Sequence, residues 1–159
     1  MKKAVFAGTF DPITKGHEAV IKKALELFDY LTVAICVNPD KKAVFSVEKR
    51  LEMLNAVLSE YDNVEVVFHQ GMLVDLMKEK GIKYNVRGVR NATDYAYENN
   101  MSEYNEKLYP EMVTIYFPCS DNLKEVSSTK VRKEVENGVY NVEYLSEKVI
   151  EIIKNNGTK

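Results

Sequence analysis

A loop near the start of the chain combines residue types that can hold a phosphate. It reads Gly-Thr-Phe-Asp-Pro-Ile-Thr-Lys-Gly-His from Gly8 to His17. Gly8 and Gly16 lack the Cβ that would keep a ligand's oxygen atoms away from the backbone. The hydroxyl of Thr9 and the imidazole of His17 add side-chain hydrogen-bonding groups. The combination favours an anion site built from main-chain and side-chain donors together.

Hydrophobic periodicity predicts the elements on both sides of this loop. The apolar run at 4–7 is typical of a buried strand, and apolar residues recur at helical spacing directly after His17. These helical positions are Ala19, Val20, Ile21, Ala24, Leu25 and Phe28. His17 is therefore predicted at a helix N-terminus, where free N–H groups and the positive end of the helix dipole attract a phosphate.

Strand and helix patterns alternate along the chain, which predicts an α/β fold. Runs of β-branched and aromatic residues occur at 4–7, 31–37, 64–68, 84–86 and 113–117. Helical patterns lie between them, including Leu51, Leu54, Val57 and Leu58, and an apolar stripe of Tyr97, Met101, Tyr104 and Leu108. We expect a single domain over residues 1–159, with a doubly wound five-stranded parallel sheet and helices on both faces. Ligands of such sheets bind beyond the carboxyl ends of the strands, where the strand order reverses.

Near the C-terminus, capping residues predict one helix end and one helix start. Asn137 and Gly138 are typical of a helix stop. Asn141 is expected to cap a last amphipathic helix. Its apolar positions are Val142, Leu145, Val149, Ile150 and Ile153.

Composition excludes several classes of protein. The 159 residues, 45% hydrophobic and 29% charged, are typical of a soluble globular domain, and no apolar run approaches the roughly 20 residues of a membrane span. A net charge of -2 argues against a nucleic-acid surface. With no export signal and only Cys36 and Cys119, we expect a cytoplasmic protein with reduced thiols.

Cationic residues nevertheless gather near the predicted loops, which suits small phosphorylated ligands. They are Lys41, Lys42, Arg87, Arg90, Lys130 and Arg132. The chain has neither the G-x-G-x-x-G nor the G-x-x-x-x-G-K-S/T phosphate signature. It also lacks a cysteine and histidine pattern suited to zinc and a pattern suited to acyl transfer, so no metal-ligating residues are expected.

Three blocks of the sequence form a series of motifs along the chain. The first joins Gly-Thr-Phe-Asp-Pro to Thr14-Lys15-Gly16-His17, which has the form T-x-G-H. The second is Arg87-Gly88-Val89-Arg90 with the residues that follow, and the third is Val126-Ser127-Ser128-Thr129. In this order the three blocks resemble the bacterial phosphopantetheine adenylyltransferase family of nucleotidyltransferases. The resemblance implies a Rossmann-like nucleotidyltransferase fold. It also implies adenylyl transfer from ATP to 4'-phosphopantetheine, giving dephospho-coenzyme A and pyrophosphate.

The resemblance implies a role for particular residues of this sequence. The catalytic residues would be Thr9, His17, Lys41 and Arg90. ATP would contact Thr9, Phe10, His17, Gly88, Val89, Arg90, Glu98, Leu123, Lys124, Glu125, Val126, Ser127, Ser128 and Thr129. Phosphopantetheine would contact Thr9, Lys41, Leu73, Arg87 and Asn105. Mg²⁺ as cofactor, dephospho-coenzyme A and coenzyme A as further ligands, and a homohexamer are implied in the same way.

Each of these side chains also has a structural interpretation. Arg87 ends a buried-looking strand and needs an anion, for which an ion pair with Asp94 or with a neighbouring subunit is the alternative to a phosphate. The polar line of Asp94, Glu98 and Asn105 is otherwise typical of a solvated helix face. Leu73 would otherwise be a core residue.

Other residues near the motifs are expected to be mainly structural. Ser127, Ser128 and Thr129 are also a favourable N-cap run. Asp11-Pro12 is expected to organise its turn, and Lys42 to be solvated.

Two functional alternatives stay open at this point. One is a cytidylyltransferase, or another adenylyltransferase with a different phosphate substrate. The other is a sensor of adenine nucleotides or coenzyme A without turnover. The sensor stays open because Leu123-Lys124-Glu125 departs from the family's usual aromatic-Ser-Phe at this point. A smaller departure is Ala43, where the family commonly has a proline.

Overall fold

The computed structural model describes residues 1–37 and 42–156, and it forms one five-stranded parallel sheet. The strands are β1 (Lys3–Gly8), β2 (Tyr30–Cys36), β3 (Val64–His69), β4 (Tyr84–Val89) and β5 (Val113–Pro118). The helices are α1 (Lys15–Leu27), α2 (Val47–Leu58), α3 (Leu73–Lys80), α4 (Ala92–Leu108), the short 3-10 helix η1 (Asp121–Leu123), α5 (Ser128–Glu136) and α6 (Glu147–Asn156). The strand order is β3-β2-β1-β4-β5, which confirms the predicted doubly wound sheet.

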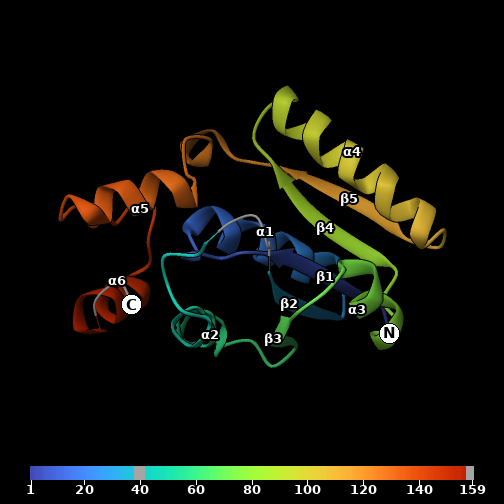
Figure 1. The fold of residues 1–159 in the computed structure, drawn as a ribbon, viewed down its shortest axis with the longest axis horizontal. Helices are drawn as coiled ribbons and strands as arrows, with labels where there is room; N and C mark the ends of the chain where they lie inside the picture. The colour runs from blue at the N-terminus through green and yellow to red at the C-terminus, as the bar shows by residue number, and fades with distance from the viewer. Residues whose placement is uncertain (38–41, 157–159) are drawn as a thin grey trace.

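Helices cover both faces of the sheet, as the alternation of strand residues requires (Figure 1). In β1, Ala4 and Phe6 join the core shared with α1, α2, α5 and α6, whereas Val5 and Ala7 join the core beneath α3. Successive strand side chains point to opposite faces, so strands buried on both sides read as continuous apolar runs. The helix α4 runs alongside β4 and β5, on the opposite side of the molecule from α5 and α6 (Figure 1).

The strand order reverses between β1 and β4. These strands pair at Ala4 with Tyr84 and at Val5 with Asn85. The chain leaves β1 toward β2 and later continues from β4 toward β5 in the other direction. The loops after β1 and β4 therefore diverge and leave a crevice at the carboxyl edge of the sheet. The loop from Gly8 to His17 begins at this crevice.

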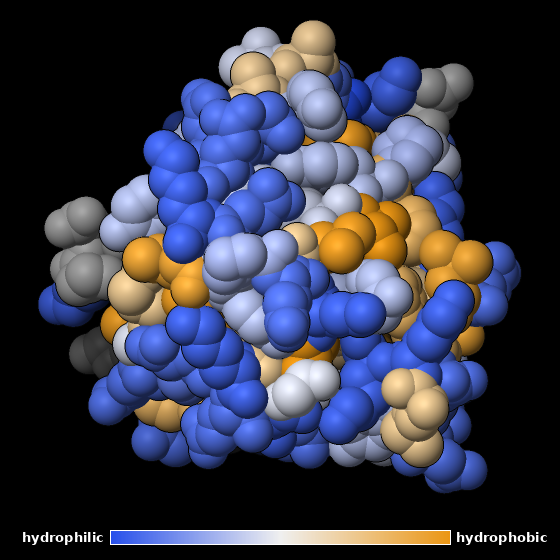
Figure 2. Space-filling view, turned by 90° about the vertical axis from the view of Figure 1, so that its right-hand side faces the viewer, coloured by the Kyte–Doolittle hydropathy of each residue, from blue (hydrophilic) through white to orange (hydrophobic). Residues whose placement is uncertain are grey.

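No helix within residues 1–37 and 42–156 is both long and apolar enough to cross a bilayer. Both cysteines, Cys36 and Cys119, are free thiols, as predicted. On the side of the molecule seen in Figure 2, hydrophilic residues cover most of the surface and hydrophobic residues form separate groups among them.

The predicted start of the last helix is wrong. The helix α6 begins at Glu147, and Asn141 instead organises a separate turn in which its Oδ1 accepts the Glu143 N–H at 2.9 Å. Two carbonyls of this turn are used by Lys15, whose N–H donates to Tyr144 O at 2.8 Å and whose Nζ donates to Val142 O at 2.6 Å. These long-range bonds replace the local bonds of a continued helix. The predicted stop at Asn137 and Gly138 is confirmed.

The apolar stripe of α4 does not face a core. Its side chains are exposed, from 39% at Leu108 to 66% at Tyr97. Of the residues of α4, all of which the structure describes, only Ser102 is buried. The helix packs on the sheet through Ser102, through a ring contact of Tyr95 with Tyr116 of β5 and through a pairing of Glu98 with Arg87 of β4. Tyr97, Met101 and Tyr104 of the apolar stripe lie at the rim of the crevice.

Gly88 of β4 is required by the packing of α1. A Cβ at this position would lie 2.7 Å from Cγ2 of Val20, which is well inside van der Waals contact. Val20 is β-branched and has little rotamer freedom on a helix, so it cannot turn away. The glycine therefore allows α1 and β4 to approach closely beside the crevice.

We expect Gly88→Ala to lower the free energy of unfolding by about 1–3 kcal/mol, because the added methyl group forces α1 away from the sheet. Chemical denaturation measures the change. The double variant Gly88→Ala, Val20→Ala removes the clashing methyl group and should recover most of this loss relative to Val20→Ala alone. Equal stabilities of the wild type and Gly88→Ala would contradict this account.

Candidate active site

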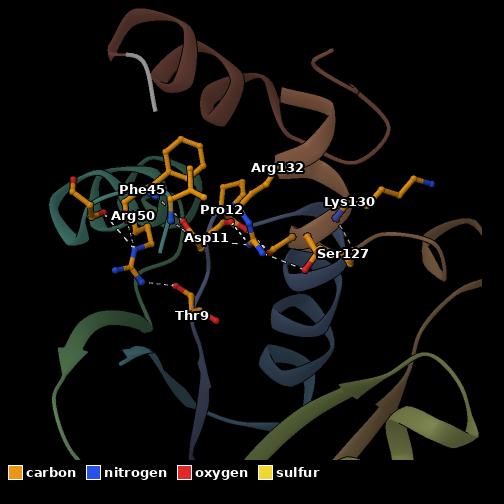
Figure 3. Close-up of polar contacts among 12 residues, drawn as sticks. Thr9, Asp11, Pro12, Phe45, Arg50, Ser127, Lys130 and Arg132 are labelled. Atoms are coloured by element: carbon orange, nitrogen blue, oxygen red, sulfur yellow. Dashed lines mark hydrogen bonds and ion pairs between the residues drawn. The ribbon is translucent and has the colours of Figure 1, made fainter. Parts of the chain in front are cut away.

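The loop after β1 is held by side chains from distant parts of the chain (Figure 3). Arg50 of α2 is only 5% exposed, and its Nη1 donates to Thr9 O at 3.0 Å. Its Nε donates to Phe45 O, also at 3.0 Å. A buried guanidinium is costly unless its N–H groups are bonded, and here they tie α2 to the loop. The backbone of Thr9 is thereby positioned from outside the loop.

The Asp11 side chain has the predicted structural role. It is buried, and its carboxylate accepts the backbone N–H groups of Val44 and Phe45, each at 2.9 Å. Arg132 of α5 donates from Nη1 to the backbone carbonyl of Asp11 at 2.8 Å. Its guanidinium also lies 3.7 Å from the Asp11 carboxylate. Asp11 therefore joins the loop to the segment before α2 and to α5.

Phe10 has a strained backbone that places its ring against His17. Its φ is 48°, in the left-handed region that non-glycine residues rarely adopt. The two rings meet edge to face with their centroids 4.9 Å apart. Such strain is retained when surrounding contacts impose it, and these contacts are supplied by Arg50 and Asp11 on either side of Phe10.

His17 lies in the first turn of α1, as predicted, and a capping box with Thr14 orients its ring. The Thr14 N–H donates to Nδ1 of His17 at 2.9 Å, while the Thr14 hydroxyl accepts from the His17 N–H. Because Nδ1 accepts, the proton of the neutral imidazole is on Nε2. Burial, with the charges of Arg87 and Arg90, lowers the pKa of His17 to about 4. His17 is therefore a neutral hydrogen-bond donor near pH 7.

Two arginines from the end of β4 and the loop after it are each held by a carboxylate of α4. Arg87 donates from Nε and Nη2 to Glu98 at 2.8 and 2.9 Å, and from Nη1 to the carbonyl of Ala7. Arg90 donates from Nε to Asp94 at 2.8 Å, and this bond lowers the pKa of that carboxyl group. The sequence-based alternative of an Arg87–Asp94 pair is therefore wrong, since the partner of Arg87 is Glu98.

The N-terminus of α5 closes the opposite side of the crevice. Ser127 caps the helix by accepting the Lys130 N–H at 3.0 Å, which confirms the N-cap interpretation. The Ser128 hydroxyl donates to the carbonyl of Pro12 at 2.9 Å. Arg90 Nη1 donates to Val126 O at 3.2 Å. The N-terminal turns of α1 and α5 therefore face the same space, and both present positive dipole ends to it.

These groups surround a cavity of about 290 Å³, here called the first cavity. Ten of the residues predicted to contact ATP line it: Thr9, Phe10, His17, Gly88, Arg90, Glu98, Leu123, Val126, Ser127 and Ser128. The cavity lining does not include Val89, Lys124, Glu125 or Thr129. Thr129 instead accepts a hydrogen bond from Arg132 at 3.2 Å. The sequence interpretation missed Asp94 and Cys119 as wall residues.

A second cavity of about 610 Å³ lies beside the first, between α4 and the start of α3. It is lined by four residues predicted to contact the second substrate: Thr9, Leu73, Arg87 and Asn105. The alternative for Leu73 as a purely core residue is not supported, because it faces this cavity. The exposed side chains Tyr97, Met101 and Tyr104 of α4 also line it. Lys41, the remaining predicted contact, lies outside the described residues.

The two cavities share one wall. Ala7, Gly8, Thr9, Arg87 and Glu98 line both. Ligands in the two cavities would therefore meet at the end of β1, next to the Arg87 guanidinium. This arrangement can bring two phosphate groups into contact within a ring of donors.

In the described part of the chain, no three His, Cys, Asp or Glu side chains are grouped so that they could hold a metal ion. The two carboxylates that line the first cavity, Asp94 and Glu98, are each paired with an arginine. The protein groups of this site are thus mainly hydrogen-bond donors, which suit phosphate oxygens better than a cation.

Comparisons with known proteins agree with this geometry. A family model described as cytidylyltransferase-like matches residues 5–134. The phosphopantetheine adenylyltransferase of Thermotoga neapolitana is 45% identical over 130 residues, which cover 82% of this chain and 81% of the relative. That of Clostridium botulinum strain Hall is 44% identical over 133 residues, covering 84% and 81%.

The fold has solved counterparts. The nicotinic acid mononucleotide adenylyltransferase of Plasmodium falciparum, complexed with NaAD, superposes with a TM-score of 0.69. The alignment covers 98% of this chain and 96% of that one, at 19% sequence identity. At this identity the likeness concerns the fold alone.

Arg50→Met should lower the free energy of unfolding by about 2–3 kcal/mol, because it leaves the carbonyls of Thr9 and Phe45 without their donor. Denaturant titration measures the loss. Lys49→Met on the same helix is the matched control and should change stability by less than about 0.5 kcal/mol. Similar losses in both variants would contradict the role of Arg50 in holding the loop.

The ligand-free protein should keep His17 neutral down to about pH 5, because its pKa is about 4. Imidazole resonances followed by NMR across pH 3–8 test this, with His69→Gln for assignment. The unfolded chain, with an ordinary histidine pKa near 6.5, binds more protons between about pH 6.5 and 4. The contribution of the neutral His17 to the free energy of unfolding is therefore fully present above about pH 6.5 and is lost as the pH falls toward about 4. Titration of His17 near 6.5 would contradict the assignment.

Proposed function

Since this chain belongs to the cytidylyltransferase-like family and, within it, to the phosphopantetheine adenylyltransferases, we propose that it transfers the adenylyl group of ATP to 4'-phosphopantetheine. The products are dephospho-coenzyme A and pyrophosphate, in a reversible late step of coenzyme A biosynthesis. The observation that carries the proposal is the pair of cavities that share a wall at Gly8, Thr9 and Arg87.

The first cavity suits the triphosphate of ATP. The dipoles of α1 and α5 and the side chains of His17, Arg90 and Ser127 all direct positive charge or donors toward it. The second cavity suits the longer acceptor, whose phosphate would lie at Thr9 and Arg87 and whose arm would contact Leu73 and Asn105. Lys41 stays a prediction as a further contact of that phosphate.

In the proposed reaction, an oxygen of the acceptor phosphate forms a bond to the α-phosphorus of ATP. The bond from that phosphorus to the oxygen bridging to the β-phosphate breaks, and pyrophosphate leaves with that oxygen. The attacking oxygen already carries negative charge, so no protein base is required. Catalysis then depends on positioning the two phosphates and on stabilising the charge that develops.

His17 and the two arginines supply this stabilisation. The neutral imidazole of His17 donates from Nε2, because its Nδ1 is engaged by Thr14. Three of the five guanidinium N–H groups of Arg87 are engaged by Glu98 and Ala7, which leaves two for a phosphate. The carboxylate partners hold the arginines in place, so less side-chain entropy is lost when phosphates bind.

Mg²⁺ belongs to the proposal as a companion of ATP. Both carboxylates of the first cavity are engaged by arginines, so the ion would be held mainly by phosphate oxygens and water, as is usual for Mg²⁺. When bound, it would neutralise charge on the β- and γ-phosphates. Activity should therefore follow the concentration of the magnesium–ATP complex.

A homohexamer in the cytoplasm is also part of the proposal. The exposed apolar side chains of α4 are suited to a subunit interface, and free thiols suit a reducing compartment. Light scattering tests the assembly, and a monomer at the concentration used for assays would contradict the proposed hexamer. Coenzyme A and dephospho-coenzyme A are expected to bind where the two cavities join, because each contains both substrate portions.

Pyrophosphate release should require both ATP and 4'-phosphopantetheine, with dephospho-coenzyme A detected by mass. His17→Ala should lower kcat by about 100–1000-fold, because it removes a donor to the reacting phosphate. His69→Ala is the matched control and should leave kcat near the wild-type value. CTP in place of ATP tests the cytidylyltransferase alternative. Tight binding of ATP or coenzyme A by a wild type without turnover would instead support the sensor.

A further inference from the structure

The inner end of the second cavity is lined by three polar side chains from different elements. They are Asn85 of β4, Ser102 of α4 and Thr114 of β5. Asn85 and Thr114 occupy paired positions on neighbouring strands. Ser102 is buried, and its hydroxyl donates to Oγ1 of Thr114 at 2.6 Å. The hydroxyl groups of Ser102 and Thr114 are therefore hydrogen-bonded to each other.

Asn85 differs from these two residues because its amide oxygen lacks such a partner. The residue is only 4% exposed, and its Oδ1 has no hydrogen-bond partner within the described ranges 1–37 and 42–156. An unpaired buried polar atom destabilises the folded state by about 1–3 kcal/mol. A leucine beside Val5, the apolar residue that pairs with Asn85 on the neighbouring strand β1, would not carry this cost. The amide therefore needs an explanation outside the stability of the fold.

The position of Asn85 relative to Arg87 supplies that explanation. The two residues are two positions apart on β4, so their Cα atoms are separated by about 6.6 Å along the strand and their side chains point to the same face. Both line the second cavity, with Arg87 at its junction with the first. A ligand whose phosphate is bound at Arg87 would have a group only a few bonds further along its arm beside Asn85.

Large side chains also line this cavity, namely Leu73, Met101 and Tyr104. Leu73 and Met101 can contact methyl and methylene groups of an arm but offer no strong hydrogen bond to an amide, whereas the Tyr104 hydroxyl and the Asn105 amide are further polar groups of the wall. The Asn85 side chain offers both a donor and an acceptor, and rotation about its terminal bond can present either one to the cavity.

We infer that Asn85 is a specificity-determining residue, which hydrogen-bonds an amide or hydroxyl group on the arm of the phosphorylated acceptor. The inference rests on the proposed function, since that function places the acceptor in the second cavity. Asn85 takes no part in the adenylyl transfer itself. It favours acceptors whose arm is polar a short distance from the phosphate, and its unpaired amide oxygen is a stability cost of that selectivity.

Asn85→Leu separates a binding role from a structural one, because the two roles predict opposite changes in the stability of the variant. The variant should raise the KM for 4'-phosphopantetheine by about 5–30-fold, with the KM for ATP unchanged within twofold. In the absence of ligands, its thermal unfolding midpoint should rise above that of the wild type. Steady-state kinetics, calorimetric titration with 4'-phosphopantetheine and thermal unfolding together provide the readouts.

Thr114→Val is the control for the sign of the stability change. Its hydroxyl has a partner in Ser102, so its removal should lower the unfolding midpoint. An unchanged KM for the acceptor in Asn85→Leu, or a lowered midpoint with both KM values raised, would overturn the inference while leaving the proposed function in place. A wild type that neither turns over nor binds 4'-phosphopantetheine would overturn the proposed function, and the inference with it.

Discussion

The pairing of β1 with β4 is the constraint on which the site depends. These strands are adjacent in the sheet but are separated in sequence by two strands and three helices. The loops that follow them diverge at the carboxyl edge, and no crossover fills the space between. The close approach of α1 to Gly88 keeps the crevice narrow enough for donors from α1, β4 and α5 to face one another.

Within this crevice, charge is balanced before any ligand binds. Arg87 and Arg90 are paired with Glu98 and Asp94, both on α4. His17 is kept neutral by burial and by the nearby positive charges. Because the donors are already oriented, binding a phosphate requires little rearrangement of the protein. The helix α4 thus supplies the carboxylates that pair with the two arginines and contributes little to the hydrophobic core, with Ser102 as its one buried residue.

Several local rules are broken around the crevice, and this is where function is expected to override stability. Phe10 has a left-handed backbone, Asn85 has an unpaired buried amide oxygen, and α4 exposes an apolar stripe. Away from the crevice the strands are apolar and helices such as α2 are capped, here at Ser46, although Glu134 Oε1 and Ser146 Oγ are also buried without a hydrogen-bond partner among the described residues. The three irregularities found together at the crevice therefore mark this edge of the sheet, whereas an unpaired buried atom alone does not.

By itself, the sequence determined the strands, the doubly wound sheet and the place of His17 in the first turn of α1, because hydrophobic periodicity and capping are local properties. It also indicated that the motif residues would meet at one edge. Only the tertiary structure decided that Arg87 pairs with Glu98, that α6 starts at Glu147 and that Arg50 reaches Thr9 across 41 positions. These outcomes depend on which backbone and side-chain groups become neighbours after folding, and no local pattern encodes that choice.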